Sequence, residues 1–306
     1  MPDAPTPPGA GRYAPSPSGD LHLGNLRTAI LAWVLARRTG RAFRLRIEDL
    51  DRVKEGSEQR QLEDLAAVGL DWDGEVVRQS ARGRAHQQAI TQLEAQDRVF
   101  ECYCTRREIL EAPSAPHAPP GAYPGTCRDL SAAKREQGRA RMRELRREPA
   151  LRLRSDVTSW QVQDLWAGEV TGAVDDLVLQ RGDGVVAYNL AVVVDDAAAG
   201  VDQVVRADDL LSSAPRQAHL AHLLGLPEPG YAHVPLAVNA HGTRLAKRDG
   251  AVTLRDRRDR GETAEEVVER IGRSLGVVGA RSARDLLECW DPAALPRHPW
   301  TVDLPD

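Results

Sequence analysis

The sequence has no apolar run long enough to cross a membrane, since a spanning helix needs about 20 consecutive apolar residues. Its first ten residues are rich in proline and alanine and lack the charged-then-apolar order of a signal peptide. We therefore expect a disordered segment over 1–10 and a cytoplasmic protein that does not contact a membrane. Positive charge is not in excess either, because the net charge is −4. This argues against a protein coated in nucleic acid, although a local basic face would suffice for transient binding.

Lysine is also scarce. The 41 basic residues include three lysines, at Lys54, Lys134 and Lys247. In a chain so rich in arginine, a lysine within a motif indicates that a compact ammonium group is needed there. The alternative for Lys247 is an ordinary surface lysine.

Cysteine is rare, and three of the four cysteines lie close in sequence. Cys102 and Cys104 are one residue apart, and Cys127 follows after another 22 residues. Because cytosolic proteins keep thiols reduced, this spacing favours a metal site, with three unligated thiols as the alternative. Zinc takes four tetrahedral ligands, so His117 in the intervening loop is the first choice for the fourth. Cys289 stands apart in an apolar stretch and is expected to be a core residue.

The 306 residues suggest two domains, or one large α/β domain with an insertion. Apolar spacing predicts helices over 26–38, 57–68 and 83–97, the second closed by Gly69. Between the first two, Phe43, Leu45 and Ile47 alternate with arginines, which predicts a half-buried strand. Alternating strands and helices indicate a parallel sheet with a nucleotide at the carboxyl ends of its strands.

The segment from Phe100 to Gly138 breaks this pattern, because it is proline-rich and carries the clustered cysteines. We expect an inserted module there, followed by a basic helix over 134–147. Glutamates interrupt its arginines, so an ion-paired surface and an RNA contact are both open. Asp183-Gly184 predicts a hairpin between 177–179 and 185–187, and a further helix is expected over 263–274.

The segment Ala14–Asn25 is a Pro-, Ser- and Gly-rich loop that leads into the first predicted helix. A helix start offers unpaired N–H groups and the positive end of the helix dipole, which suits phosphate. A Cβ at Gly24 would hold a nucleotide away from this backbone. The alternative for His22 is a hydrogen-bonded residue that starts the helix.

Together with distant segments, this loop resembles the class I aminoacyl-tRNA synthetases, whose two signatures usually read HIGH and KMSKS. They stand here as His22-Leu23-Gly24-Asn25 and Arg244-Leu245-Ala246-Lys247-Arg248. Three further segments are similar to the glutamate and glutamine branch of that class: Arg12–Gly19, Arg46–Asp51 and Tyr188–Asp196. The resemblance implies an α/β fold with a Rossmann-type parallel sheet, a zinc-bearing insertion and a short helical C-terminal region.

The resemblance also implies ATP-dependent activation of L-glutamate, with Mg²⁺ accompanying the ATP. His22 and the backbone near Gly24 would bind the phosphates, and Lys247 on a mobile loop would neutralise the polyphosphate. His22 and Lys247 are therefore the expected catalytic residues. Ala246 and Arg248 replace the serines of KMSKS, which leaves hydroxyl contacts to ATP at those positions unassigned.

For the amino acid, the resemblance implies two guanidinium groups for the two carboxylates, Arg12 and Arg206. Ser16 and Tyr188 would add hydroxyl groups, and Glu48 would accept from the ammonium group. Alternatives are a surface acidic pair at Glu48 and a core-edge tyrosine at Tyr188. Ala207 follows Arg206 where the family commonly has glycine.

The metal ligands and the acceptor also follow from the resemblance. Many full-length glutamyl-tRNA synthetases have a histidine where this sequence has Asp129, two residues after Cys127. The short members, which attach glutamate to queuosine in tRNA(Asp), have a tyrosine at the position of Tyr123. The expected zinc ligands are therefore Cys102, Cys104, Tyr123 and Cys127, in preference to His117.

We expect a monomer. We also expect it to transfer glutamate to queuosine in the anticodon loop of tRNA(Asp), because the 56 residues after Gly250 leave no room for an anticodon-binding domain. Rival interpretations are a truncated enzyme that charges the acceptor end of tRNA(Glu) and a non-catalytic RNA-binding module. The expected organisation places the catalytic domain in 11–99 and 149–255, the zinc-bearing and basic-helix insertion in 100–148, and the helical C-terminal region in 256–306.

Overall fold

The computed structural model describes residues 9–111, 123–245 and 252–302. Its largest sheet within these ranges has seven strands in the order β3-β2-β1-β9-β10-β6-β7. The strands are β1 (Ala10–Tyr13), β2 (Ala42–Ile47), β3 (Val77–Arg78), β6 (Ser159–Asp164), β7 (Gly168–Ala173), β9 (Val201–Ala207) and β10 (Gly230–Val234). All neighbours pair in parallel except β6 and β7. The predicted Rossmann-type parallel sheet is confirmed.

One face of this sheet is covered by α1 (Leu23–Arg38), which starts three residues before the predicted range. The helix is apolar nearly all round because the sheet packs on one side of it and C-terminal helices pack on the other. Phe43 and Leu45 of β2 point into this core, while the alternating Arg44 and Arg46 face the opposite side. The predicted alternation of β2 is confirmed.

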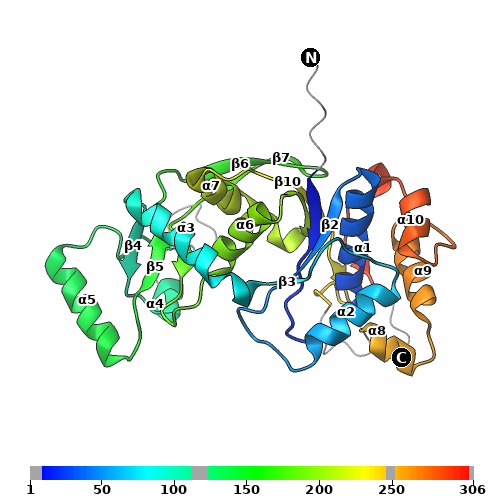
Figure 1. Cartoon of the computed structure of the whole chain (residues 1–306), viewed down its shortest axis with the longest axis horizontal. Helices are drawn as coiled ribbons and strands as arrows, with labels where there is room; N and C mark the ends of the chain where they lie inside the picture. The colour runs from blue at the N-terminus through cyan, green and yellow to red at the C-terminus, as the bar shows by residue number, and fades with distance from the viewer. Residues whose placement is uncertain (1–8, 112–122, 246–251, 303–306) are drawn as a thin grey trace, which may run out of the picture.

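The opposite side carries α3 (Gly83–Ala95), α6 (Tyr188–Ala198) and α7 (Ala214–Leu224), which share a second apolar core (Figure 1). The helix predicted over 57–68 is α2 (Ser57–Ala67), and Gly69 follows it with φ +87°. A left-handed residue at this place favours glycine, as predicted. Short 3₁₀ helices lie at Gln79–Arg82 (η1) and Asp208–Ser213 (η2).

A separate antiparallel sheet lies at one end of the molecule, at the left of Figure 1, and combines a strand at the start of the insertion with two strands that follow it in sequence. It consists of β4 (Val99–Cys102), β5 (Ala150–Leu153) and β8 (Val178–Gln180), with α4 (Arg106–Glu111) and α5 (Ala132–Glu144) beside it. The basic helix is α5. Three of its arginines, Arg139, Arg141 and Arg143, pair with Glu101, Glu108 and Glu136. These contacts are those of the ion-paired alternative.

The predicted hairpin around Asp183-Gly184 is present in a short form, because Arg181 N–H donates to the carbonyl of Val185 and Ala187 N–H donates to the carbonyl of Leu179, both at 2.9 Å. Gly184 does turn, with φ +84°, and Gln180 bridges to Val186. However, β8 pairs with β5, and the residues after the turn lead directly to Ala187, which caps α6. The second arm of the hairpin is therefore short, and it leads directly into α6.

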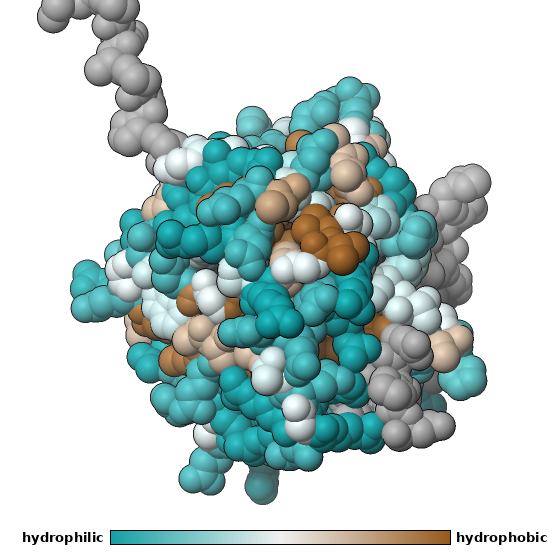
Figure 2. Space-filling model, turned by 90° about the vertical axis from the view of Figure 1, so that its right-hand side faces the viewer, coloured by the Kyte–Doolittle hydropathy of each residue, from teal (hydrophilic) through white to brown (hydrophobic). Residues whose placement is uncertain are grey.

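The C-terminal region packs against α1. It comprises α8 (Leu254–Asp259), α9 (Ala264–Ser274), α10 (Ala283–Cys289), the 3₁₀ turn Pro292–Ala294, and β12 (Trp300–Thr301), which pairs with β11 (Ala237–Val238). The helix predicted over 263–274 is confirmed, with Thr263 as its N-cap. Cys289 was expected in the core, but it ends α10 and is exposed. Figure 2 shows this side of the molecule as mainly hydrophilic with separate small apolar patches. Within the ranges described, no helix combines the length and apolarity needed to span a membrane.

Candidate active site

Four of the five residues predicted to hold glutamate converge at the carboxyl ends of parallel strands. Arg12 lies on β1 and Arg206 on the neighbouring β9, and both are buried, with 4% and 5% of their surface exposed. Glu48 directly follows β2, and Tyr188 is the first residue of α6. These are the strand ends at which open α/β sheets bind ligands.

A buried ion-pair network fixes Arg12 and Glu48. The carboxylate of Asp196 accepts from Arg12 Nε at 3.4 Å and from Arg46 Nη1 at 2.5 Å. Arg46 also pairs with Glu48 at 3.2 Å. Burial opposes ionisation of Asp196, but Arg46 and Arg12 outweigh it and lower the pKa of that carboxyl group. Burial raises the pKa of Glu48, against the lowering effect of Arg46 and Arg12.

Arg206 has a different environment. Its Nε donates to His233 Nε2 at 2.9 Å, Nη1 donates to Gln217 Oε1 at 2.7 Å, and Nη2 donates to the carbonyl of Leu210 at 3.3 Å. All three acceptors are neutral groups. Burial lowers the pKa of Arg206.

Tyr188 contributes its hydroxyl group to the same place. Although 40% of its surface is exposed, burial of the hydroxyl and the nearby Glu48 carboxylate raise its pKa, while Arg206 and Arg12 act in the opposite direction. Ser16 follows Pro15, whose carbonyl accepts from the backbone N–H of Glu48 at 2.9 Å, and its contact with glutamate remains a prediction. Its side chain is exposed, and its carbonyl accepts from Gln61 Nε2 at 3.0 Å.

His22 is the N-cap of α1. Its Nδ1 accepts from the backbone N–H of Asn25, and Asn25 Oδ1 accepts from the backbone N–H of His22, both at 3.2 Å. The hydrogen-bonded helix start considered from sequence is therefore present. Because the cap uses Nδ1 as an acceptor, a neutral ring carries its proton on Nε2.

Gly24 is buried, and a Cβ there would lie 2.6 Å from the Cβ of Ala237 and 3.1 Å from the ring of His22. The glycine is thus required by the packing of α1 against β11. The nucleotide contact inferred from sequence remains a prediction.

The second signature begins close to the first. Lys247 lies outside the described residues, as does the rest of 246–251. On one side of this segment, Leu245 N–H donates to the carbonyl of Ala237 at 3.0 Å. On the other side, the carbonyl of Val252 accepts from Leu23 N–H at 2.9 Å, and His22 forms a bridge with Thr253. Both flanks of the segment therefore attach to the region where α1 begins.

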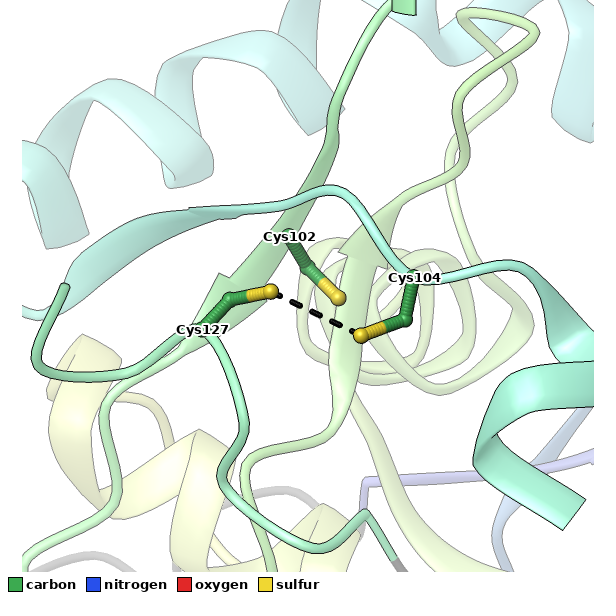
Figure 3. A group of neighbouring side chains, drawn as sticks. All are labelled: Cys102, Cys104 and Cys127. Carbon is green, nitrogen blue, oxygen red and sulfur yellow. Dashed lines mark hydrogen bonds between the residues drawn. The ribbon is translucent and has the colours of Figure 1, made fainter. Parts of the chain in front are cut away.

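Three cysteines form a candidate metal centre in the insertion. The sulfur atoms of Cys102, Cys104 and Cys127 all lie within 4.8 Å of one another, and Figure 3 shows them pointing toward a common centre. Tetrahedral zinc with Zn–S bonds of about 2.3 Å would place sulfur atoms about 3.8 Å apart. Cys104 and Cys127 approach to 3.5 Å, so the spacing fits.

The Tyr123 hydroxyl lies 3.5 Å from Cys102 Sγ and accepts from the backbone N–H of Cys127 at 2.7 Å. It is thus adjacent to the sulfur cluster. Asp129 is directed elsewhere, into an exposed pair with Arg154 at 2.8 Å. His117 lies outside the described residues.

Comparison with known proteins now decides the family. The family model described as tRNA synthetases class I (E and Q), catalytic domain, matches residues 10–286. The chain belongs to this family. It is an aminoacyl-tRNA synthetase-like ligase, and its glutamyl-tRNA synthetase-like character agrees with the expectation from the motifs.

Relatives of this class I synthetase cover nearly all of the chain. It is 62% identical to the glutamyl-Q tRNA(Asp) synthetase of Nocardia farcinica over 98% of this chain and 94% of that protein. It is 38% identical to glutamate–tRNA ligase 1 of Methylorubrum extorquens over 96% of this chain but 62% of that protein. The crystal structure of the Elizabethkingia anophelis glutamate–tRNA synthetase shares the fold, with a TM-score of 0.80, 23% identity, and coverage of 97% and 68% of the two chains.

Four residues with no predicted role hold the arginines of this class I synthetase in place. Arg46 and Asp196 stand inside the quoted motifs, but no role was predicted for them. His233 and Gln217 stand outside those motifs. The sequence does contain this imidazole and this amide, on elements that lie next to β9 in the structure. Their contact with Arg206 can be inferred only when the order of the strands is known.

Proposed function

We propose that the enzyme activates L-glutamate with ATP, without needing tRNA for that step, and transfers it to queuosine in the anticodon loop of tRNA(Asp). The observation that carries the proposal is the convergence of Arg12, Glu48, Tyr188 and Arg206 at one sheet edge. An amino acid with two carboxylates and one ammonium group needs two cations and one anion, and this cluster supplies that set.

Arg206 provides the sharpest support for a bound carboxylate. It is 5% exposed, and its described hydrogen-bond acceptors are an imidazole, an amide and a carbonyl. A buried cation without a direct anionic partner is costly, and a substrate carboxylate would relieve that cost. Arg12 would bind the second carboxylate, and Glu48 would accept from the ammonium group.

Activation joins the α-carboxylate of glutamate to the α-phosphorus of ATP as pyrophosphate leaves. Negative charge builds on the phosphate oxygens, so catalysis is a matter of positioning and electrostatic stabilisation. His22 and the backbone N–H groups near Gly24 would face the phosphates at the positive end of α1. Lys247 would add a positive charge, and Mg²⁺ would be bound mainly by the phosphates themselves.

We further propose one structural zinc ion held by Cys102, Cys104, Tyr123 and Cys127. The sulfur spacing and the adjacent phenol support this ligand set. The ion would tie the turn after β4 to the loop that contains Cys127. It lies in the insertion, and we assign it no part in the reaction.

The acceptor is inferred from the names of the relatives. Relatives named glutamyl-Q tRNA(Asp) synthetase, including one from Cutibacterium acnes at 51% identity, support queuosine in tRNA(Asp) as the acceptor.

A charging assay with radiolabelled glutamate tests the acceptor. The substrates are tRNA(Asp) with queuosine, the same tRNA without its 3′-terminal adenosine, and tRNA(Asp) from a strain unable to make queuosine. We expect charging of the first two and none of the third. Loss of charging on 3′ truncation would favour acceptor-end aminoacylation, for which tRNA(Glu) is the matched substrate.

Absence of glutamate-dependent pyrophosphate exchange would favour a non-catalytic RNA-binding module.

A further inference from the structure

The arginines of the proposed glutamate site differ in how their charge is balanced. Arg12 is paired directly with the carboxylate of Asp196. Arg206 donates instead to Nε2 of His233, and the carboxylate of Asp164 contacts Nδ1 of the same ring. Asp164, His233 and Arg206 thus form a linear relay across three neighbouring strands, β6, β10 and β9.

The chemistry of the relay fixes the state of His233. Asp164 is held as a carboxylate, because it accepts from the backbone N–H groups of Trp166, Ala167 and His233 at 2.8 to 2.9 Å. Its contact of 2.7 Å with His233 Nδ1 therefore requires a proton on that nitrogen. A guanidinium group can only donate, so Nε2 must present a lone pair to Arg206. His233 is the neutral Nδ1–H tautomer.

We propose that Asp164 and His233 are positioning residues for substrate binding: they aim Arg206 and hold it with a neutral acceptor, so that its charge stays available to a carboxylate of glutamate. This inference rests on the proposed function. An aspartate in direct contact with Arg206 would occupy the guanidinium as an internal anion. The imidazole of His233 keeps the orientation of the Arg206 guanidinium group and separates it from the Asp164 carboxylate by the width of the ring.

The relay predicts a pH dependence of glutamate binding. A proton on His233 Nε2 would face the Nε–H of Arg206 and remove its acceptor. The charged and titratable groups around the ring are Asp164 on β6, Arg206 on β9, Arg12 on β1, Asp208 on η2 and Tyr231 on β10 itself. Burial lowers the pKa of His233, which Asp164 opposes and Arg206 reinforces. The relay is therefore intact at neutral pH, and glutamate binding weakens when the ring is protonated in acid.

Three substitutions of His233 separate positioning from simple packing. His233→Gln keeps a neutral acceptor, His233→Leu removes it, and His233→Glu supplies an internal anion. His219→Leu is the matched control, because His219 is also a buried histidine paired with an aspartate, Asp156 at 3.3 Å, and it has no described contact with Arg206. The readouts are the KM for glutamate and for ATP in pyrophosphate exchange, each measured between pH 5.5 and 8.5.

We expect His233→Leu and His233→Glu to raise the KM for glutamate about 10- to 100-fold, the range for losing a hydrogen bond to a charged group. The KM for ATP should stay unchanged, and His233→Gln should lie closest to the wild type. The rise in glutamate KM that the wild type shows in acid should be smaller in His233→Gln, and the part that persists is expected from protonation of Glu48, whose pKa is raised by burial. Equal glutamate KM values in His233→Leu and His219→Leu would overturn the proposal.

The tautomer gives a test that does not depend on the reaction. Nitrogen-15 spectra of histidine-labelled protein, assigned through His233→Gln, should show His233 protonated at Nδ1. A proton at Nε2 would overturn the relay in any case. If the wild type catalyses no glutamate-dependent exchange, the proposed function fails and the substrate role of the relay fails with it, while the tautomer still reports on the hydrogen bonds.

Discussion

Asp196 joins Arg12 to Arg46 beneath the candidate glutamate site, although 184 residues separate it from Arg12. Its carboxylate is 7% exposed, and the two guanidinium groups it contacts are 5% and 4% exposed. One buried anion therefore compensates two buried cations, and Glu48 adds a second anion through Arg46. This arrangement makes the orientation of Arg12 depend on α6, the helix that also supplies Tyr188.

Replacing Asp196 should damage both stability and binding. Asp196→Asn leaves Arg12 and Arg46 with one fewer anion in a buried site, and breaking a buried pair in this way costs about 3–5 kcal/mol. We expect a loss of that size in urea unfolding, together with a higher KM for glutamate. Asp71→Asn is the control, because the Asp71 side chain, which pairs with Arg37, is 69% exposed. Such a surface pair should contribute about 1 kcal/mol or less to the free energy of unfolding. Similar losses in the two variants would contradict the network.

His22 can be tested separately for its two roles. His22→Asn retains an N-cap acceptor, whereas His22→Ala removes both the cap and the imidazole. If the imidazole stabilises the transition state, both variants should lose about 10²- to 10³-fold in pyrophosphate exchange, and His22→Ala alone should also be less stable by about 1 kcal/mol. Full activity in His22→Asn would reduce His22 to a capping residue.

Lys247 is proposed to supply a positive charge to the polyphosphate of ATP. Lys247→Ala should lower the exchange rate about 10²- to 10³-fold without changing the melting temperature. Lys54→Ala is the matched control, because Lys54 is an exposed lysine. An equal effect of the two substitutions on exchange would contradict the assignment of Lys247.

The local part of this fold was predictable because it depends on periodicity. Helix α1, strand β2 and the glycine after α2 follow from residues within about 15 positions of one another. The motif residues Arg12, Glu48, Tyr188 and Arg206 were found through resemblance, and the structure brings them together. Their supports were not found, since contacts such as Asp164–His233 depend on which strands are neighbours. Cys289 was misjudged because apolar neighbours in sequence do not determine which face of a short helix is covered.

The cysteine cluster should hold one zinc ion per chain. Cys102→Ser and Cys104→Ser should abolish zinc in elemental analysis of purified protein, and Tyr123→Phe should weaken its retention against a chelator. His117→Ala and Cys289→Ser should keep the full amount. Zinc loss in His117→Ala would transfer the fourth position from Tyr123 to His117.

A last prediction concerns Asp64, which is 6% exposed on α2. Burial raises its pKa to about 6, above the ordinary value near 3.9 that it has in the unfolded chain. A group with a raised folded pKa contributes stability below its unfolded pKa and loses that contribution as the pH rises through the folded value. Wild-type stability should therefore fall between about pH 4 and pH 6–7 because of this carboxyl group.

Asp64→Asn removes the ionisation, so the variant should gain stability relative to the wild type on going from pH 4 to pH 7.5. Asp285→Asn is the control with the opposite expected sign, because backbone hydrogen bonds at the start of α10 lower the pKa of Asp285. The Asp285 carboxylate stabilises the protein above its unfolded pKa, so that variant should lose relative stability over the same pH range. Urea unfolding of the three proteins at both pH values measures the two differences. The same sign of change in both variants would show that burial does not control ionisation of Asp64.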